Sequence, residues 1–199
     1  MAIVERKIAV FDFDGTLTNK DTFVEFIKFV FGIYRWSWGF FLYSPILIAM
    51  KLHLYSNSKA KERVFSHFFR GMDYGCFKKY CEAFSSSISS MVNANTLDML
   101  KEHLRQGHKV YIVSASIYEW VAAWSRTVRI ERVLSTCVEV SEKGLLTGCF
   151  STPNCYGEEK VRRFLTAEPD RESYELYAYG DSRGDKEMLA LADHAYKIS

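Results

Sequence analysis

The stretch Ile8-Ala9-Val10-Phe11-Asp12-Phe13-Asp14-Gly15-Thr16 joins an apolar run to two closely spaced carboxylates. The apolar half predicts a buried strand over residues 3–11 that ends at the first aspartate. Asp12 and Asp14 are separated by one residue, and carboxylates that close repel each other unless they share a cation or a proton. Hard divalent cations such as Mg²⁺ take oxygen ligands of this kind. We therefore expect the chemistry of the protein to begin at the end of this strand.

The region after residue 93 alternates between predicted strands and predicted helices. Apolar runs at 110–113 and 176–179 predict buried strands, the Lys143-Gly144 turn predicts a hairpin, and helices are predicted at 95–106, 117–126, 158–165 and 185–192. This alternation favours an α/β fold whose parallel sheet is covered on both faces. A chain of 199 residues suits one such core, assigned to residues 1–15 and 93–199, with residues 16–92 as an inserted helical domain.

The inserted residues 16–92 are rich in aromatic side chains. The spacing of the apolar residues from Phe23 onward predicts an amphipathic helix at the start of the insertion. Further along, Pro45 interrupts an uncharged stretch, and because proline breaks helices we expect two short helices there. Residues 56–84 are predicted to be helical, and the serine cluster at 85–90 is predicted as the connection back to the core.

Residues 36–50 carry no charged side chain. A helix of that length reaches about 22 Å, which is too short to cross a hydrocarbon core of roughly 30 Å. Two interpretations stay open: these residues form the core or the substrate-facing wall of the insertion, or they contact a membrane surface, with Arg35 and Lys51 at the interface. The insertion holds 10 lysines and arginines against 5 aspartates and glutamates, and this basic balance favours contact with anionic lipid headgroups.

Polar side chains stand at the ends of three predicted strands: Asp12 and Asp14 after the first, Ser114 after the second, and Asp181 with Asp185 after the third. In open parallel α/β sheets, ligands bind outside the carboxyl ends of the strands. We therefore expect these residues, which are distant in the sequence, to converge in one active site.

Four segments resemble the motifs of a known family in order and in spacing. They are Asp12-Phe-Asp-Gly-Thr16, Val113-Ser-Ala-Ser116, Gly157-Glu-Glu-Lys-Val161 and Gly180-Asp-Ser-Arg-Gly-Asp185. Together they look like motifs one to four of the haloacid dehalogenase (HAD) superfamily, and the large insertion is similar to that of subfamily IB, the phosphoserine phosphatase-like proteins. The resemblance implies a Rossmann-like core with a parallel sheet flanked by helices, and a helical cap inserted between motifs one and two.

Two further segments narrow the resemblance. Ser116-Ile-Tyr-Glu-Trp120 and Cys155-Tyr-Gly-Glu-Glu-Lys160, together with the aromatic, proline-containing insertion, resemble the phosphatidylglycerophosphatase C branch most. This implies a substrate that is either a lipid phosphate such as phosphatidylglycerophosphate or, as in the phosphoserine phosphatase type, a phosphorylated small molecule.

The resemblance implies a magnesium-dependent phosphomonoester hydrolase and a role for each motif residue. Asp12 would attack phosphorus to form an aspartyl-phosphate, and Asp14 would act as general acid and base. Mg²⁺ would be held by Asp12, the main-chain carbonyl of Asp14, Asp181 and, in support, Asp185.

The remaining motif residues are implied to bind the substrate. Ser114, the backbone N–H of Ala115 and Lys160 would hold the phosphoryl oxygens. Phosphoserine phosphatases usually show Ser-Gly-Gly where this chain has Ser114-Ala115-Ser116, and Ala115 still offers its N–H. Asp21 stands where that subfamily places an acidic residue that contacts the amine of the substrate, which makes it a candidate substrate-binding residue.

Simpler interpretations of the same residues stay open. Ser114 also suits the N-cap of a following helix, and Lys160 could pair with Glu158 or Glu159 on a helix surface. A dehalogenase, a phosphotransferase and a non-catalytic scaffold that keeps the fold are the rival functions. The acidic fourth motif argues against dehalogenation, because displacing a halogen from carbon needs no metal held among carboxylates.

The composition indicates the compartment. The first residues lack the charged and apolar regions of a signal peptide, so export is not expected. The five cysteines are odd in number and lack the paired spacing of a zinc site, and we interpret them as reduced thiols. We therefore expect a cytoplasmic protein, either free or peripheral at the inner face of the membrane, with no nucleic-acid partner.

Overall fold

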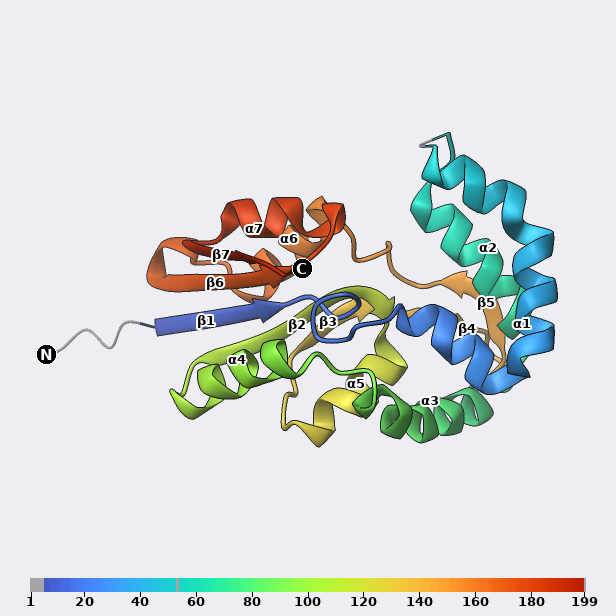
Figure 1. Ribbon diagram of the computed structural model, residues 1–199, viewed down its shortest axis with the longest axis horizontal. Helices are drawn as coiled ribbons and strands as arrows, with labels where there is room; N and C mark the ends of the chain where they lie inside the picture. Colours follow the sequence, from blue (N-terminus) through green and yellow to red (C-terminus); the bar gives the residue numbers. More distant parts are fainter. Residues whose placement is uncertain (1–5, 53, 199) are drawn as a thin grey trace, which may run out of the picture.

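The computed structural model describes residues 6–52 and 54–198, and its centre is a five-stranded sheet with the strand order β3-β2-β1-β6-β7 (Figure 1). The strands are β1 (Arg6–Phe11), β2 (Lys109–Ile117), β3 (Val133–Thr136), β6 (Tyr174–Gly180) and β7 (His194–Lys197). All neighbouring strands are parallel, and β1 lies in the middle, paired with β2 and β6. The predicted parallel α/β fold is confirmed, although residues 3–5 of the predicted first strand lie outside the described residues.

Helices cover both faces of this sheet (Figure 1). They are α4 (Ala94–Arg105) and α5 (Tyr118–Thr127) on one face, and α6 (Glu158–Ala167) and α7 (Lys186–Leu191) on the other. Because successive side chains of a strand point to opposite faces, Phe11 packs with Trp120 of α5 in one buried cluster, and Val10 packs with Phe164 of α6 in the other. The unbroken apolar run before Asp12 therefore reflects a strand buried on both sides.

Three helices between β1 and α4 form the insertion, and we call them the insertion helices: α1 (Thr22–Lys51), α2 (Asn57–Phe69) and α3 (Tyr74–Ser89). Figure 1 shows them beside the end of the sheet where β1 and β2 terminate. The predicted break at Pro45 is wrong, because α1 breaks at Gly32 (φ 77°, ψ 166°) and continues through Pro45. Glycine adopts this positive φ without a Cβ penalty, whereas the helix tolerates Pro45 because the Ser44 hydroxyl donates to the Phe41 carbonyl (2.8 Å), which proline leaves without its backbone donor.

Residues 56–84 are helical, as predicted, and they belong to two helices, α2 and α3, with a turn at Gly71 (φ 82°) between them. The connection back to the core differs from the prediction. The serine cluster is not a connection, because α3 runs on to Ser89. The hydroxyl of Ser85 donates to the carbonyl of Glu82 within the helix (2.7 Å), and such bonds let serines continue a helix.

The predicted hairpin is present as β4 (Val138–Val140) and β5 (Leu146–Phe150), which pair antiparallel. It packs against the insertion helices, since the rings of Phe150 and Phe65 lie 5.3 Å apart. The first residue of β5 also bonds to the backbone between α2 and α3: the Gly71 N–H donates to the Leu146 carbonyl (2.8 Å), and the Leu146 N–H donates to the Met72 carbonyl (2.9 Å). The hairpin thus connects the C-terminal half of the chain to the insertion.

Candidate active site

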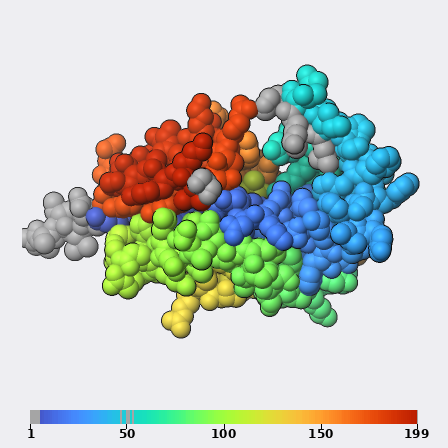
Figure 2. All heavy atoms as spheres, in the orientation of Figure 1, coloured from blue at the N-terminus to red at the C-terminus, as the bar shows by residue number. Residues whose placement is uncertain are grey.

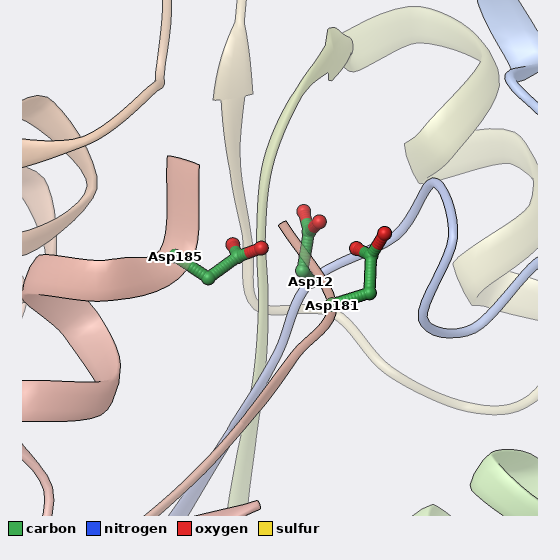
Figure 3. A group of neighbouring side chains, drawn as sticks. All are labelled: Asp12, Asp181 and Asp185. Carbon is green, nitrogen blue, oxygen red and sulfur yellow. The ribbon is translucent and has the colours of Figure 1, made fainter. Parts of the chain in front are cut away.

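The strand ends bring together three carboxylates, as the sequence predicts. Asp12 directly follows β1, Asp181 directly follows β6, and Asp185 stands at the start of α7. One carboxylate oxygen from each residue lies within 4.8 Å of those of the other two, and Figure 3 shows the three side chains grouped together. Ser114 lies beside them on β2, which continues through Ser114 to Ile117 rather than ending there, and its side chain is buried.

Lys160, in the first turn of α6, lies between two of these carboxylates. Its Nζ donates to Oδ1 of Asp12 and to Oδ1 of Asp185, both at 2.6 Å, and the side chain is buried. Burial alone would lower the pKa of Lys160, but the two carboxylates raise it above its ordinary value. The lysine therefore belongs to the site and does not pair on the helix surface with its neighbours Glu158 and Glu159.

The site carries more negative charge than Lys160 offsets. The pKa of Asp12 is raised to about 7, mainly by burial and also by the charge of Asp185, while Lys160 opposes the shift. Burial and the nearby Asp185 also raise the pKa of Asp181. Carboxylates in this state gain stability from a proton or from a cation, and Mg²⁺ prefers oxygen ligands of this type. The donor set of Asp12, Asp181 and Asp185 thus fits a hard divalent cation.

The turn after β1 is shaped around Asp181. Gly15 has φ 80°, and a Cβ placed there would lie 2.3 Å from Oδ2 of Asp181. The Thr16 hydroxyl donates to Oδ1 of the same carboxylate at 3.2 Å. Only glycine gives this close approach, because any side chain would displace the carboxylate.

Asp14 is partly buried and held on both of its carboxyl oxygens. Oδ1 accepts from the backbone N–H (2.9 Å) and the hydroxyl (2.6 Å) of Thr22, and Oδ2 accepts from Ser116. Trp120 Nε1 in turn donates to the Thr22 hydroxyl at 3.1 Å. Burial, followed by the charge of Asp21, raises the pKa of Asp14. Asp14 is thus tied to the first turn of α1 and to the second motif.

Ala115 is engaged through its carbonyl. Lys61 Nζ, from insertion helix α2, donates to this oxygen at 2.7 Å, and the Thr136 hydroxyl donates to it at 3.0 Å. The predicted phosphate contact of the Ala115 N–H stays a prediction.

Asp21 lies apart from the three carboxylates and caps α1. Its Oδ1 accepts from the backbone N–H groups of Phe23 (2.9 Å) and Val24 (3.2 Å). Its predicted contact with substrate stays a prediction, although the residue lines the same cavity.

A cavity of about 300 Å³ joins these residues. Its polar wall holds Asp12, Asp14, Asp21, Ser114, Lys160 and Lys61, and its apolar wall holds Phe23, Val24, Phe40 and Val64. The molecular surface is hollowed between the C-terminal part of the core and the insertion helices (Figure 2). The cavity therefore combines charged side chains with apolar side chains in one lining.

Sequence reasoning missed Lys61, Thr22 and the side chain of Ser116 as site residues. Lys61 had a detectable signal, because it precedes the buried Val64 and Phe65 by three and four positions and so shares their helical face. Thr22 had none, since its contact with Asp14 depends on how the chain turns between them.

Comparison with known proteins gives concordant matches. A family model described as haloacid dehalogenase-like hydrolase matches residues 9–190. The protein CicA of Caulobacter vibrioides is 33% identical over 197 residues, covering 98% of this chain and 87% of its own. A Bordetella pertussis protein of unknown function has a similar structure, with a TM-score of 0.80 at 20% identity over 94% of this chain and 87% of its own. A phospho-aspartyl intermediate analogue of phosphoserine phosphatase has a TM-score of 0.64 at 19% identity, covering 94% and 84%.

Proposed function

Because this chain belongs to the haloacid dehalogenase-like hydrolases, whose family model matches residues 9–190, we propose that it is a phosphomonoesterase that uses Asp12 as nucleophile. One observation carries the proposal: Asp12 follows the central strand, lines the cavity, accepts a hydrogen bond from Lys160 and is grouped with Asp181 and Asp185. A hydrolase site of this composition suits an anionic phosphoryl group, because Lys160 and Ser114 can bind its oxygens beside the nucleophile.

The reaction proceeds in two displacements. An oxygen of Asp12 attacks phosphorus, the bond from phosphorus to the alcohol oxygen breaks, and an aspartyl-phosphate forms. Asp14 gives its proton to the departing oxygen, then takes a proton from the water that attacks the intermediate. Inorganic phosphate leaves and both carboxyl groups return to their first state. The raised pKa of Asp14 supports this role, since it favours the protonated acid that the first step needs.

Mg²⁺ is the proposed cofactor. Asp12, Asp181, the main-chain carbonyl of Asp14 and, in support, Asp185 would hold it, and the close fit of Gly15 against Asp181 keeps one ligand in place. Bound there, the ion would offset the repulsion between the anionic nucleophile and the anionic phosphoryl group.

Phosphate release from an aryl phosphate tests the proposal. We expect Mg²⁺-dependent release that EDTA abolishes, and a loss of about 10³-fold or more in Asp12→Asn, because an amide cannot form the phospho-enzyme. Asp170→Asn is a matched control, since Asp170 precedes the short helix η1 (Arg171–Ser173) and lies outside the cavity. Wild-type protein that releases no phosphate from a broad panel of monoesters, lipid monoesters included, would leave the non-catalytic scaffold as the better account.

The second half of α1 supports a lipid phosphate as substrate. Beyond Gly32, large apolar side chains face solvent, with exposed fractions of 89% for Tyr34, 70% for Trp38 and 72% for Phe41. No helix in the described residues is long and apolar enough to cross a membrane. A surface of this kind suits insertion into the headgroup region, and the same helix contributes Phe40 to the cavity wall. The side chains of Leu47 and Met50 lie outside the described part.

We therefore propose that the insertion helices act as a cap that contacts the inner face of the membrane and that residues 36–50 carry this contact. The alternative is a cytoplasmic small-metabolite phosphatase of the phosphoserine phosphatase type, favoured by the polar residues Lys61 and Asn57 in the cavity. An assay of phosphatidylglycerophosphate beside phosphoserine distinguishes them: a clear preference for phosphoserine would reject the lipid substrate.

A further inference from the structure

The side chain of Lys61 extends from insertion helix α2 to the backbone of β2 at the edge of the sheet where the candidate site lies. Its stem leaves the apolar face of the helix, and its ammonium reaches the Ala115 carbonyl at 2.7 Å. The side chain is partly buried and lines the cavity with Asp14 and Asp21. It is thus a cation supplied by the insertion to the site where the substrate must lie.

The ammonium group of Lys61 has more hydrogen-bond donors than it has partners among the described residues. A lysine ammonium has three donors, and among the described residues Lys61 makes one hydrogen bond, to Ala115. The Phe23 ring lies 5.2 Å from Nζ and covers another side of the ammonium. Burial lowers the pKa of Lys61, while Asp21, Asp14 and Asp12 oppose this shift. Donor capacity therefore remains for a group that enters the cavity.

Fold stability does not explain why a lysine stands here. The Thr136 hydroxyl lies 3.0 Å from the Ala115 carbonyl and 3.1 Å from Asn154 Oδ1, so a second donor for this carbonyl is in place beside Lys61. An apolar residue at this position would pack beside Val64 without the cost of burying a charge. The position suits a cation that acts on a ligand.

The two lysines of the cavity have different tasks. Lys160 is bonded to Asp12 and Asp185, so it serves the phosphoryl group that Asp12 attacks. Lys61 lies on the insertion side with Asn57, one helical turn earlier, which also lines the cavity. In an in-line displacement the leaving part of a phosphomonoester points away from Asp12, and Lys61 and Asn57 are the polar side chains that α2 contributes to the same cavity.

We propose that Lys61 binds a second anionic group, carried on the leaving part of the phosphomonoester, and that it makes the enzyme selective for substrates with such a group. The inference rests on the proposed phosphatase function. Two sources share this chemistry: the phosphodiester of a lipid headgroup and the carboxylate of a small metabolite.

Three substrates distinguish the effect of a charged leaving group from the chemical identity of that group. Ethyl phosphate has an uncharged leaving group, phosphoglycolate carries a carboxylate, and short-chain phosphatidylglycerophosphate carries a phosphodiester. The kcat and KM values of the wild type are compared with those of Lys61→Met, which keeps the length but not the charge, and Lys61→Arg. Lys59→Met is the control, because Lys59 is exposed on the same helix.

The wild type is expected to prefer one or both charged substrates over ethyl phosphate. Lys61→Met should lower kcat/KM for the preferred charged substrate by about 10- to 100-fold more than for ethyl phosphate, mainly through KM, because one charge-assisted hydrogen bond is lost. Lys61→Arg should restore part of the preference, and Lys59→Met should keep it. The charged substrate whose kcat/KM falls most in Lys61→Met shows whether the anionic group is a lipid phosphodiester or a metabolite carboxylate.

Equal losses on all three substrates in Lys61→Met would overturn the inference, as would a wild type without preference for charge. Calorimetry measures how tightly the three substrates bind to Asp12→Asn protein. This measurement distinguishes a failure of the inference about Lys61 from a failure of the proposed phosphatase function. If no variant or wild type releases phosphate, tighter binding of phosphoglycolate or the lipid than of ethyl phosphate, lost in Asp12→Asn/Lys61→Met, would still support the role of Lys61. Equal binding of all three would reject it.

Discussion

Gly15 is the residue whose replacement should affect the site most directly without removing a charge. It combines φ 80° with a Cβ position 2.3 Å from the Asp181 carboxylate, so Gly15→Ala must displace a proposed metal ligand. We expect phosphate release to fall at least about tenfold and the Mg²⁺ concentration for half-maximal activity to rise. Gly107→Ala is a matched control, because Gly107 has φ 75° but nothing within 4 Å of its Cβ position. Equal effects in both variants would show that backbone strain alone is responsible.

His103 should make stability depend on pH. Both ring nitrogens are engaged, one with His108 (2.7 Å) and one with the hydroxyl of Tyr179 (2.9 Å), and burial with the charge of His108 lowers the pKa of His103 to about 4. Between about pH 6.5 and 4 the unfolded chain binds a proton that the folded chain does not, so stability falls as pH falls. We expect His103 to contribute about 2 kcal/mol of this loss between pH 7 and pH 5.

Urea unfolding at pH 7 and pH 5 tests this expectation. The pH-dependent difference in free energy of unfolding should shrink in His103→Gln and persist in His67→Gln, where the histidine is exposed. A wild-type difference that survives unchanged in His103→Gln would contradict the assignment.

At the scale of residues, side chains that belong to a local sequence motif could be predicted from the sequence. The convergence of the strand-end aspartates was predictable because parallel strands bring their carboxyl ends to one edge of the sheet, and Lys160 lies with them. Lys61 and Thr22 were missed because their contacts with Ala115 and Asp14 depend on how the insertion folds over that edge. Tertiary packing, rather than spacing, determines those contacts.

Among the elements, α1 carries the proposed membrane contact. We expect the wild type to sediment with vesicles of anionic lipid, and Trp38→Ser/Phe41→Ser to lose at least about tenfold in partitioning, because each ring buries substantial apolar area in the headgroup region. Met99→Ser is a control, since Met99 is 41% exposed on α4, outside the insertion. Absence of binding by the wild type at low salt would favour the small-metabolite substrate.

The elements show where sequence patterns are weak. The apolar runs of β1, β2 and β6 were predictable because buried parallel strands are continuously apolar. β3 and β7 were not predicted, since each has four residues and three of the four side chains of β7 are exposed. The position of the break in α1, at Gly32 rather than Pro45, was not predicted either. Proline removes only one helical hydrogen bond, so a helix can continue through it. Whether a glycine adopts positive φ depends on the surrounding fold.

Across the whole molecule, the insertion and the sheet share one hydrophobic core. Phe26 of α1 lies 4.7 Å from the Trp120 ring of α5, and it also contacts Phe69, Phe77 and Phe84 of the other insertion helices. The same buried cluster includes Phe11 of the central strand. The proposed division at residues 15 and 93 therefore separates segments of the chain that are packed together.

Phe26→Ala tests this sharing. Phe26 is fully buried, so the variant should lose about 3–5 kcal/mol of stability while still unfolding in a single calorimetric transition. Tyr80→Ala is a control, since that ring is 37% exposed on α3. Two separate transitions, with only one shifted by the substitution, would show that the insertion folds independently.

The β4–β5 hairpin limits how this protein can be recombined with its relatives. Backbone groups of Gly71 and Met72, between α2 and α3, bond to Leu146, and the N–H of Tyr74 donates to the carbonyl of Gly144, about 70 residues later in the chain. A chimera that exchanges residues 16–92 alone would separate these backbone groups from their partners and place a foreign helix against Phe150. A chimera should therefore acquire the substrate preference of another family member only when residues 138–150 are exchanged together with residues 16–92.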